Sequence, residues 1–316
     1  MMVANVETMF FVGKTPWHGL GEKLDSPPTI AEAITQSGLD WEVGLKQLYT
    51  AEGAEVPAKA TYRLSDNSVL GVVGPRYTPL QNQDAFGWFQ PFVDSGLVNL
   101  HTAGSLQNGK KIWVLADINR DPSVITPGDE VAKFIMLSNS HDGTTAIRVG
   151  FTPIRIVCAN TLAMAHKSSA SKLIRVRHTS SSRVNLDKLR EIMDLVNSEF
   201  EATAEQFRFL ASRHYNQVDI RKYVKAVLGV ERVDDADLPT RTKNTMNSIF
   251  ALIENERQSV GKTRGTWWAA YNGVNEYFNY HQGRTADNRL NSLWFGTGHA
   301  DNARALELAQ QFSLAV

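Results

Sequence analysis

The sequence predicts an α+β fold: an N-terminal antiparallel sheet with helices on one face, followed by an all-α C-terminal region. Short apolar segments joined by tight turns fill residues 43–151, whereas apolar residues at helical spacing dominate beyond Leu186. A basic stretch rich in serine and threonine separates the two patterns. We therefore expect a sheet domain at 1–166, a connector at 167–185 and a helical domain at 186–316.

The first expected element is a helix that begins after Ser26 and ends near Gly38. Pro27 and Pro28 fit its first turn, where no amide hydrogen is needed. A second helix is expected at 82–93, with Asn82 as its N-cap and Pro91 as an early end or a kink.

Strands and hairpin turns account for the rest of this half. Asp66-Asn67, Gln107-Asn108-Gly109 and His141-Asp142-Gly143 suit turns, because glycine and short polar residues tolerate the backbone angles that hairpins require. The expected strands are 43–50, 59–64, 68–74, 97–106, 110–118, 131–139 and 145–151.

Residues 155–166 are apolar, and we expect a strand at first and a helix after Cys158. An acidic connector lies at 230–239. Apolar spacing predicts the C-terminal helices at 186–212, 217–228, 240–258, 266–282 and 301–314.

Overall charge gives no support for nucleic-acid binding, because 33 Lys and Arg stand against 33 Asp and Glu. Any such argument depends on where the charges lie. The single cysteine, Cys158, excludes a disulfide within the chain and fits a cytoplasmic location. We recognise no signal peptide and no apolar run of transmembrane length, so no membrane contact is expected.

The clearest local feature is a basic segment from Thr144 to Arg190, in which only Asp187 opposes the cations. Hydroxyl side chains alternate with the basic ones. This combination suits a phosphate backbone, which requires charge neutralisation rather than base readout. The alternative is a solvated linker. The predicted phosphate contacts are Arg148, Arg155, Lys167, Lys172, Arg175, Arg177 and Arg183.

Aromatic side chains of the strands are candidates for base stacking, chiefly Trp113 and Phe151. Alternation places Trp113 on the face opposite Ile112 and Val114, so one of these faces is expected to lie outside the core. The alternative is ordinary core packing. The aromatic-rich helix after Thr266 is expected to pack in a core or a helix–helix interface rather than to bind a ligand.

The sequence gives no support for an enzyme. Gly261-Lys262-Thr263 resembles the end of a phosphate-binding loop, but Glu256 replaces the required glycine and no strand is expected before it. The eight histidines include no HExxH pair, and the apolar setting of Cys158 disfavours an activated thiol. We therefore predict no catalytic residue, no metal site and no cofactor.

Four motifs, in order, resemble a family of phage, prophage and plasmid proteins that is grouped as a domain of unknown function. They are Pro16–Gly21, Asn139–Gly143, Arg155–Leu162 and Gly265–Asn272, and they span nearly the whole chain. The resemblance implies a phage or plasmid origin and a location in the host cytoplasm. It implies no settled activity.

The order of elements is also similar to the core of single-strand annealing proteins of the RecT, Redβ and Erf type. That resemblance implies an oligomeric ring or filament that holds single-stranded DNA in a basic groove without a nucleotide cofactor. The leading hypothesis is therefore binding of single-stranded DNA or RNA, with annealing or recombination as its role. The alternative is a phage-encoded interaction protein that inhibits or redirects a host factor through its aromatic C-terminal helices.

Overall fold

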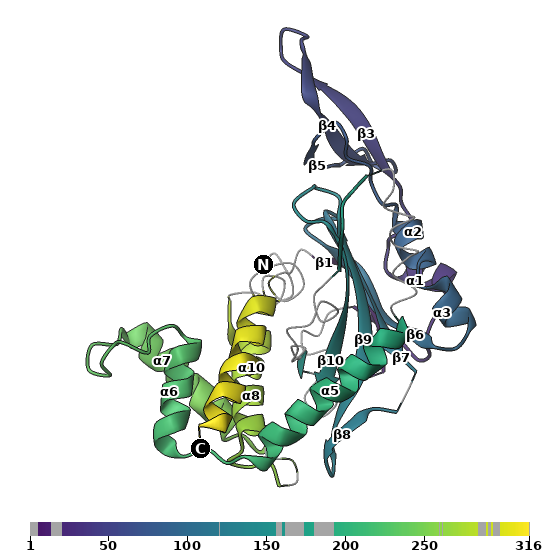
Figure 1. Ribbon diagram of the computed structural model, residues 1–316. Coiled ribbons are helices and arrows are strands. Elements are labelled where there is room, and N and C mark those ends of the chain that lie inside the picture. The colour runs from purple at the N-terminus through teal and green to yellow at the C-terminus, as the bar shows by residue number, and fades with distance from the viewer. Residues whose placement is uncertain are drawn as a thin grey trace. The chain divides into compact units, whose positions relative to one another are not determined.

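The computed structural model describes residues 6–13, 21–119, 121–155, 160–161, 174–179, 193–258, 260, 262–283, 289, 292 and 298–315. The fold is mixed α/β, with antiparallel sheets and with most of the described helices in the C-terminal part, as the sequence predicts (Figure 1). Two compact units are formed. The first contains Met1–Arg120, Phe134–Phe151 and Lys172–Val196, and the second contains Asp121–Lys133, Thr152–Ser171 and Asn197–Val316.

The first unit is built on a sheet with the strand order β10–β9–β7–β6–β1–β2, and β12 pairs with β10 outside this order. Strands β9, β7, β6 and β1 pair antiparallel in turn, β12 pairs antiparallel with β10, and β2 pairs parallel with β1. The strands are β1 (Val6–Val12), β2 (Glu22–Leu24), β6 (Val98–Leu106), β7 (Lys111–Ile118), β9 (Asp129–Ser140), β10 (Ile147–Arg155) and β12 (Ile174–Val176).

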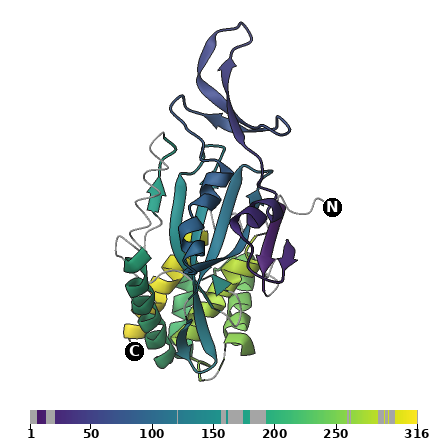
Figure 2. The same ribbon diagram turned by 90° about the vertical axis from the view of Figure 1, so that its right-hand side faces the viewer.

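Three short helices lie together on one face of this sheet (Figures 1 and 2). They are α1 (Ile30–Gln36), α2 (Asn82–Gly87) and α3 (Gln90–Asp94), which pack against β1, β7 and β6 respectively. A capping box starts α1, because Thr29 Oγ1 accepts a hydrogen bond from the Glu32 amide while the Glu32 carboxylate accepts one from the Thr29 amide.

The predicted helix at 82–93 is two helices, and the prediction of Asn82 as its cap is wrong. Gln81 is the N-cap of α2, and Asn82 is fully buried within the helix. The Asn82 amide donates to the Trp41 carbonyl, and its Oδ1 atom accepts from His141 Nε2 at 2.9 Å. A buried polar side chain is thereby satisfied by tertiary partners instead of by a cap.

A separate sheet of the first unit contains β3 (Val43–Tyr49), β4 (Glu55–Arg63) and β5 (Val69–Val73), in that order. The register shifts between Gln47 and Leu48, opposite the segment that contains Pro57. Gln47 Nε2 donates to the backbone carbonyls there, including that of Ala58 at 3.2 Å. This bulge lets β4 accept a proline, which has no amide hydrogen for a regular ladder.

In the second unit, two short strands extend the ends of β9 and β10. Strand β8 (Ser123–Thr126) pairs with the start of β9, and β11 (Asn160–Thr161) pairs with Ile154 and Arg155 at the end of β10. The expectation of a helix after Cys158 is therefore wrong at 160–161, because backbone pairing with β10 keeps these residues extended. Cys158 itself lies outside the described residues.

Helices make up the rest of this unit. They are α5 (Met193–Ser212), α6 (Gln217–Val227), α7 (Thr240–Ile253), α8 (Trp267–Glu276) and α10 (Gly298–Leu314), together with a 3-10 turn at Glu256–Gln258 and a π-turn at Tyr277–His281. In the described part of the chain, no helix combines the length and apolar character needed to cross a membrane.

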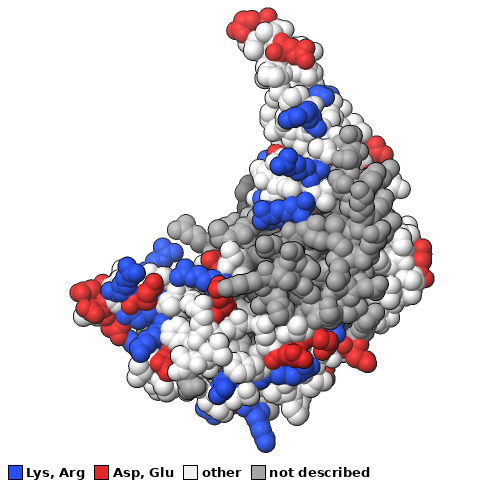
Figure 3. Space-filling view, viewed as in Figure 1, with Lys and Arg blue, Asp and Glu red and all other residues white. Residues whose placement is uncertain are grey.

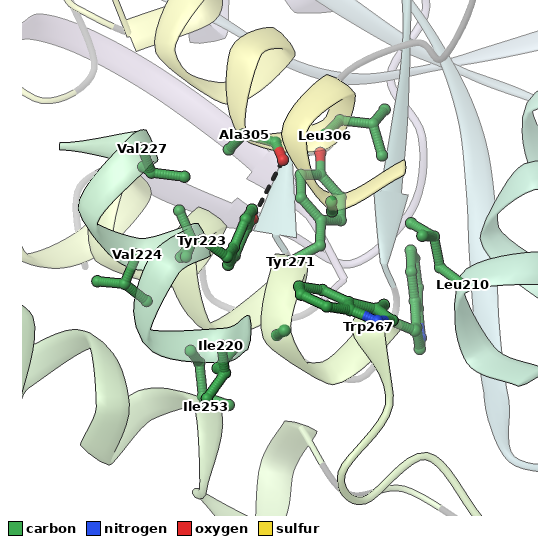
Figure 4. Close-up of a cluster of buried hydrophobic side chains, with 14 of the residues drawn as sticks. Leu210, Ile220, Tyr223, Val224, Val227, Ile253, Trp267, Tyr271, Ala305 and Leu306 are labelled. Carbon is green, nitrogen blue, oxygen red and sulfur yellow. Dashed lines mark hydrogen bonds between the residues drawn. The ribbon is translucent and has the colours of Figure 1, made fainter. Parts of the chain in front are cut away.

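The aromatic helix α8 forms the centre of the second unit's core (Figure 4). Trp267, Trp268 and Tyr271 are fully buried. Tyr223 of α6 packs beside them and donates its hydroxyl hydrogen to the Ala305 carbonyl at 3.1 Å. The predicted core role of this helix is confirmed, and its aromatic rings present no surface for a protein partner.

Candidate functional site

The structure separates the residues that were predicted to contact phosphate. Arg148, Arg175 and Arg177 belong to the first unit, whereas Arg155 belongs to the second. Lys167, Lys172 and Arg183 lie outside the described residues.

Arg155 is enclosed in the interior of the second unit. Its guanidinium binds both carboxylate oxygens of Asp129, at 2.7 and 2.6 Å, and also contacts Gln258, which in turn bonds Glu276. Trp268 donates its indole hydrogen to the same Asp129 carboxylate at 2.7 Å. Because the Arg155 side chain is 0% exposed, it has no surface to offer a nucleic acid.

This buried network joins residues of two of the sequence motifs. Arg155 opens the motif Arg155–Leu162, and Trp268 belongs to Gly265–Asn272. The Arg155 guanidinium lies 5.4 Å from the Trp268 ring centroid, and β11 packs against α8. Arg155 and Trp268, one residue from each motif, therefore lie together in the second unit's interior.

The structure also corrects Trp113 as a candidate for base stacking. The expectation that one face of 111–118 lies outside the core is wrong, because Ile112 and Val114 on one face and Trp113 and Leu115 on the other are all buried. Strand β7 is central in its sheet and is covered on both sides. Phe151 is partly buried, and its stacking role stays a prediction.

A groove of about 510 Å³ lies in the first unit. Its walls come from three segments far apart in sequence: the loop after β5, the turn between β9 and β10, and the residues that follow β12. The lining residues are Gly74, Pro75, Arg76, Tyr77, Gly143, Thr144, Thr145, Ala146, Arg177, His178 and Thr179.

Tyr77 and His178 stack within the groove wall, with ring centroids 4.6 Å apart and planes 28° from parallel. The Tyr77 hydroxyl donates to the Ser140 carbonyl at 2.9 Å. Burial lowers the pKa of His178, so the imidazole is neutral at pH 7. His178 Nε2 lies 3.2 Å from the Thr145 carbonyl, which can only accept, so Nε2 donates this hydrogen bond.

An arginine face adjoins the groove. Arg148 of β10 and Arg175 of β12 are direct partners in the strand register, so their side chains share one side of the sheet, and Arg177 follows Arg175. Their neighbours Ile147 and Val176 are buried on the opposite side.

These three arginines, with the exposed Arg76 of the groove rim, form what we call the arginine face. Within the described residues, none of the four makes an ion pair with a carboxylate. Figure 3 shows basic side chains on the surface below the acidic end of the β3–β4 hairpin. The neutral total charge of the chain therefore conceals a local basic surface.

Among the described residues, three buried polar atoms near the groove have no hydrogen-bond partner: Thr145 Oγ1, His178 Nδ1 and Arg148 Nε. Thr145 and His178 line the groove, and Arg148 lies two residues beyond the lining residue Ala146 on β10. Since buried polar atoms are normally bonded, this cluster offers donors and acceptors to a bound molecule.

Sequence reasoning placed Arg148, Arg175 and Arg177 in one basic segment but did not include Arg76 or His178 among the binding residues. About 100 residues separate Arg76 from His178 along the chain, and the groove exists only once β10 and β12 pair. The one local signal was the motif at Asn139–Gly143, whose last residue forms part of the groove wall.

No curated protein and no solved structure matches this chain. A family model described as a domain of unknown function (DUF932) matches residues 69–294. This range is more than half of the chain and includes every residue of the groove and of the arginine face. The chain therefore belongs to the DUF932 family.

Proposed function

We propose that the chain binds single-stranded DNA or RNA through the arginine face and the groove of the first unit. The observation that carries this proposal is the convergence of Arg76, Arg148, Arg175 and Arg177 without an ion-paired carboxylate among the described residues. Cations gathered in this way attract a polyanion and release its counterions on binding. The hydroxyl groups of Thr144, Thr145 and Thr179 supply further contacts for phosphate oxygens.

The groove favours a single strand over a duplex. Its volume of about 510 Å³ falls in the range of small-ligand sites. One unstacked base of a single strand can enter a groove of this size, whereas a base that is paired within a duplex is held away from it. Tyr77 and His178 provide aromatic wall surface, and Thr145 Oγ1 and His178 Nδ1 provide hydrogen-bonding atoms. In this proposal Lys167, Lys172 and Arg183 extend the phosphate contacts.

The biological role that we propose is annealing or recombination by a phage- or plasmid-encoded protein in the host cytoplasm. The order of elements, similar to that of the RecT, Redβ and Erf proteins, supports this role. It also supports assembly into a ring or filament and action without a nucleotide cofactor.

Fluorescence anisotropy with single- and double-stranded oligonucleotides of one length, over a series of salt concentrations, tests the proposal. The expected result is tighter binding of the single strand and an affinity that falls steeply with salt. Binding that does not change between low and moderate salt contradicts the phosphate contacts. A preference for the duplex contradicts the role of the groove.

A second candidate function is binding of a host protein, and one observation favours it. Four of the large hydrophobic side chains that are strongly exposed in the described residues lie on the small sheet β3–β5 and its loops: Tyr49 (61%), Leu64 (46%), Val69 (64%) and Val72 (60%). Exposed apolar surface of this kind marks protein contacts. A nuclease-treated pull-down from host lysate that yields one stoichiometric protein, lost in a Val69→Ser, Val72→Ser double variant, supports this candidate.

A further inference from the structure

We propose that Arg148 and Arg175 form a two-arginine seat for one phosphate group, and that a phosphate bound there strengthens the pairing of β12 with β10. The inference deepens the proposed function and rests on it for the ligand, a phosphate of a nucleic-acid strand. It assigns a distinct role to two of the four arginines of the arginine face.

The strand register places the two side chains together. Arg148 of β10 is the direct partner of Arg175 of β12 in an antiparallel pair. Directly opposite residues in such a pair have Cβ atoms about 4.5–5.5 Å apart, so both guanidinium groups reach one ligand between them. On the other side of the sheet, Ile147 and Val176 form a buried apolar pair that fixes this register.

The free protein holds these two cations at an energetic cost, because like charges directly opposite each other destabilise a strand pair. Partial burial and the charge of Arg175 both lower the pKa of Arg148. Among the described residues, Arg148 Nε is buried without a hydrogen-bond partner, and neither arginine is ion-paired with a carboxylate. A phosphate accepts charge-assisted hydrogen bonds from both guanidinium groups and removes their repulsion.

Phosphate binding and strand pairing are therefore linked. Both arginines meet one phosphate only when β12 is paired with β10, so the ligand stabilises the paired state by mass action. Because strand β12 is only three residues long, a small change in the free energy of its pairing with β10 strongly changes how often the two strands are paired. The same argument gives the two arginines an unusual property: removal of either one stabilises the free protein and weakens the response to ligand.

The test measures the melting temperature of the full chain with and without inorganic phosphate and pyrophosphate, against potassium chloride of equal ionic strength. The natural protein is expected to gain melting temperature, and the amides of 174–176 are expected to exchange hydrogen more slowly with phosphate. In Arg175→Gln, the melting temperature without ligand is expected to rise by about 1–3 °C while the phosphate response is lost. Arg148→Gln repeats the test from the other strand.

Two further variants separate the seat from a general charge effect. Arg175→Glu places a carboxylate opposite Arg148, so it is expected to stabilise the free protein at least as much as Arg175→Gln and to abolish the response. Arg241→Gln removes one positive charge from an exposed arginine of α7 in the second unit. It is expected to change neither the melting temperature without ligand nor the response to phosphate.

Each outcome supports or overturns the inference. A phosphate response that survives in Arg175→Gln, or no response in the natural protein, overturns it. If oligonucleotides bind with full affinity to Arg148→Gln and Arg175→Gln, the seat and the contribution of these two arginines are refuted, while nucleic-acid binding through Arg76, Arg177 and the groove stands. If phosphate acts through both arginines in a chain that binds no oligonucleotide, the seat is supported and the proposed function is refuted.

Discussion

Arg155 and Asp129 form a bidentate ion pair in which both side chains are 0% exposed. The pair joins the end of β10 to the start of β9 within the second unit, and Trp268 donates a further hydrogen bond to the Asp129 carboxylate. An arginine of the basic segment thus serves the interior of the protein. Its charge is compensated by a residue 26 positions earlier in the chain.

Replacement of Arg155 by alanine is expected to lower the free energy of unfolding by about 3–5 kcal/mol, because Asp129 is left as an uncompensated buried charge. The measurement is denaturant unfolding followed by tryptophan fluorescence, to which Trp268 contributes. Nucleic-acid binding by folded protein is expected to keep its salt dependence. A loss below about 1 kcal/mol, or a reduced salt slope, contradicts the interior role.

Arg175→Ala and Arg177→Ala are each expected to reduce the slope of log affinity against log salt by about 1, because each removes one phosphate contact. Anisotropy titrations with a single-stranded oligonucleotide measure the slope. Arg241→Ala is the matched control, since Arg241 is an exposed arginine of the second unit. Equal slopes for all three variants contradict the assignment of the arginine face.

Much of the fold follows from local sequence. The turn at Gln107-Asn108-Gly109 is an example, because all three residues adopt positive φ angles of 56°, 56° and 82° between β6 and β7. Asn67 likewise has a φ of 59° in the turn before β5. Such positions depend on the residue itself, so the sequence predicts them. The short strands β2, β8 and β12 were not predicted, because pairing partners rather than local patterns define them.

The candidate site was predictable only in part, for a related reason. The count of charges along the sequence does not distinguish Arg148 from Arg155. In the structure, Arg148 lies beside the groove, whereas Arg155 is buried and ion-paired with Asp129. Only the pairing partner distinguishes them. Similarly, alternation along 111–118 carries no sign that β7 is covered on both faces, because that depends on elements elsewhere in the chain.

Acid is expected to destabilise the first unit through His101. Its ring packs edge-on against Phe134, with centroids 5.1 Å apart, and burial lowers its pKa from 6.5 to about 4. The folded state then favours the neutral ring, so the unfolded state binds more protons and stability falls as the pH drops from about 6.5 to about 4. The lowering of the His101 pKa from 6.5 to about 4 corresponds to a loss of about 3 kcal/mol in the free energy of unfolding below pH 4.

The matched variant is His101→Phe, which keeps an aromatic ring against Phe134 but cannot titrate. Denaturant unfolding at several pH values between 7 and 4 is expected to show a flatter profile in this variant. His141, whose pKa burial lowers to about 3, still contributes acid sensitivity to both proteins. Parallel profiles for the two proteins contradict the role of His101.

The same substitution at two helical glycines is expected to have opposite effects. A Cβ atom at Gly273 of α8 would lie 2.7 Å from the backbone N and Cα atoms of Ile253, where helix α7 ends. The two helices approach this closely only because Gly273 has no side chain. Gly273→Ala therefore forces the backbones apart and is expected to cost about 1–3 kcal/mol.

At Gly87, the last residue of α2, a Cβ atom meets nothing within 4 Å. Gly87→Ala is expected to stabilise the protein by about 0.5–1 kcal/mol, because alanine loses less conformational freedom than glycine in a helix. Urea unfolding of both variants gives the two free energies under identical conditions. If Gly273→Ala is as stable as the natural protein, the backbones of α7 and α8 do not meet at Ile253 as the structure places them.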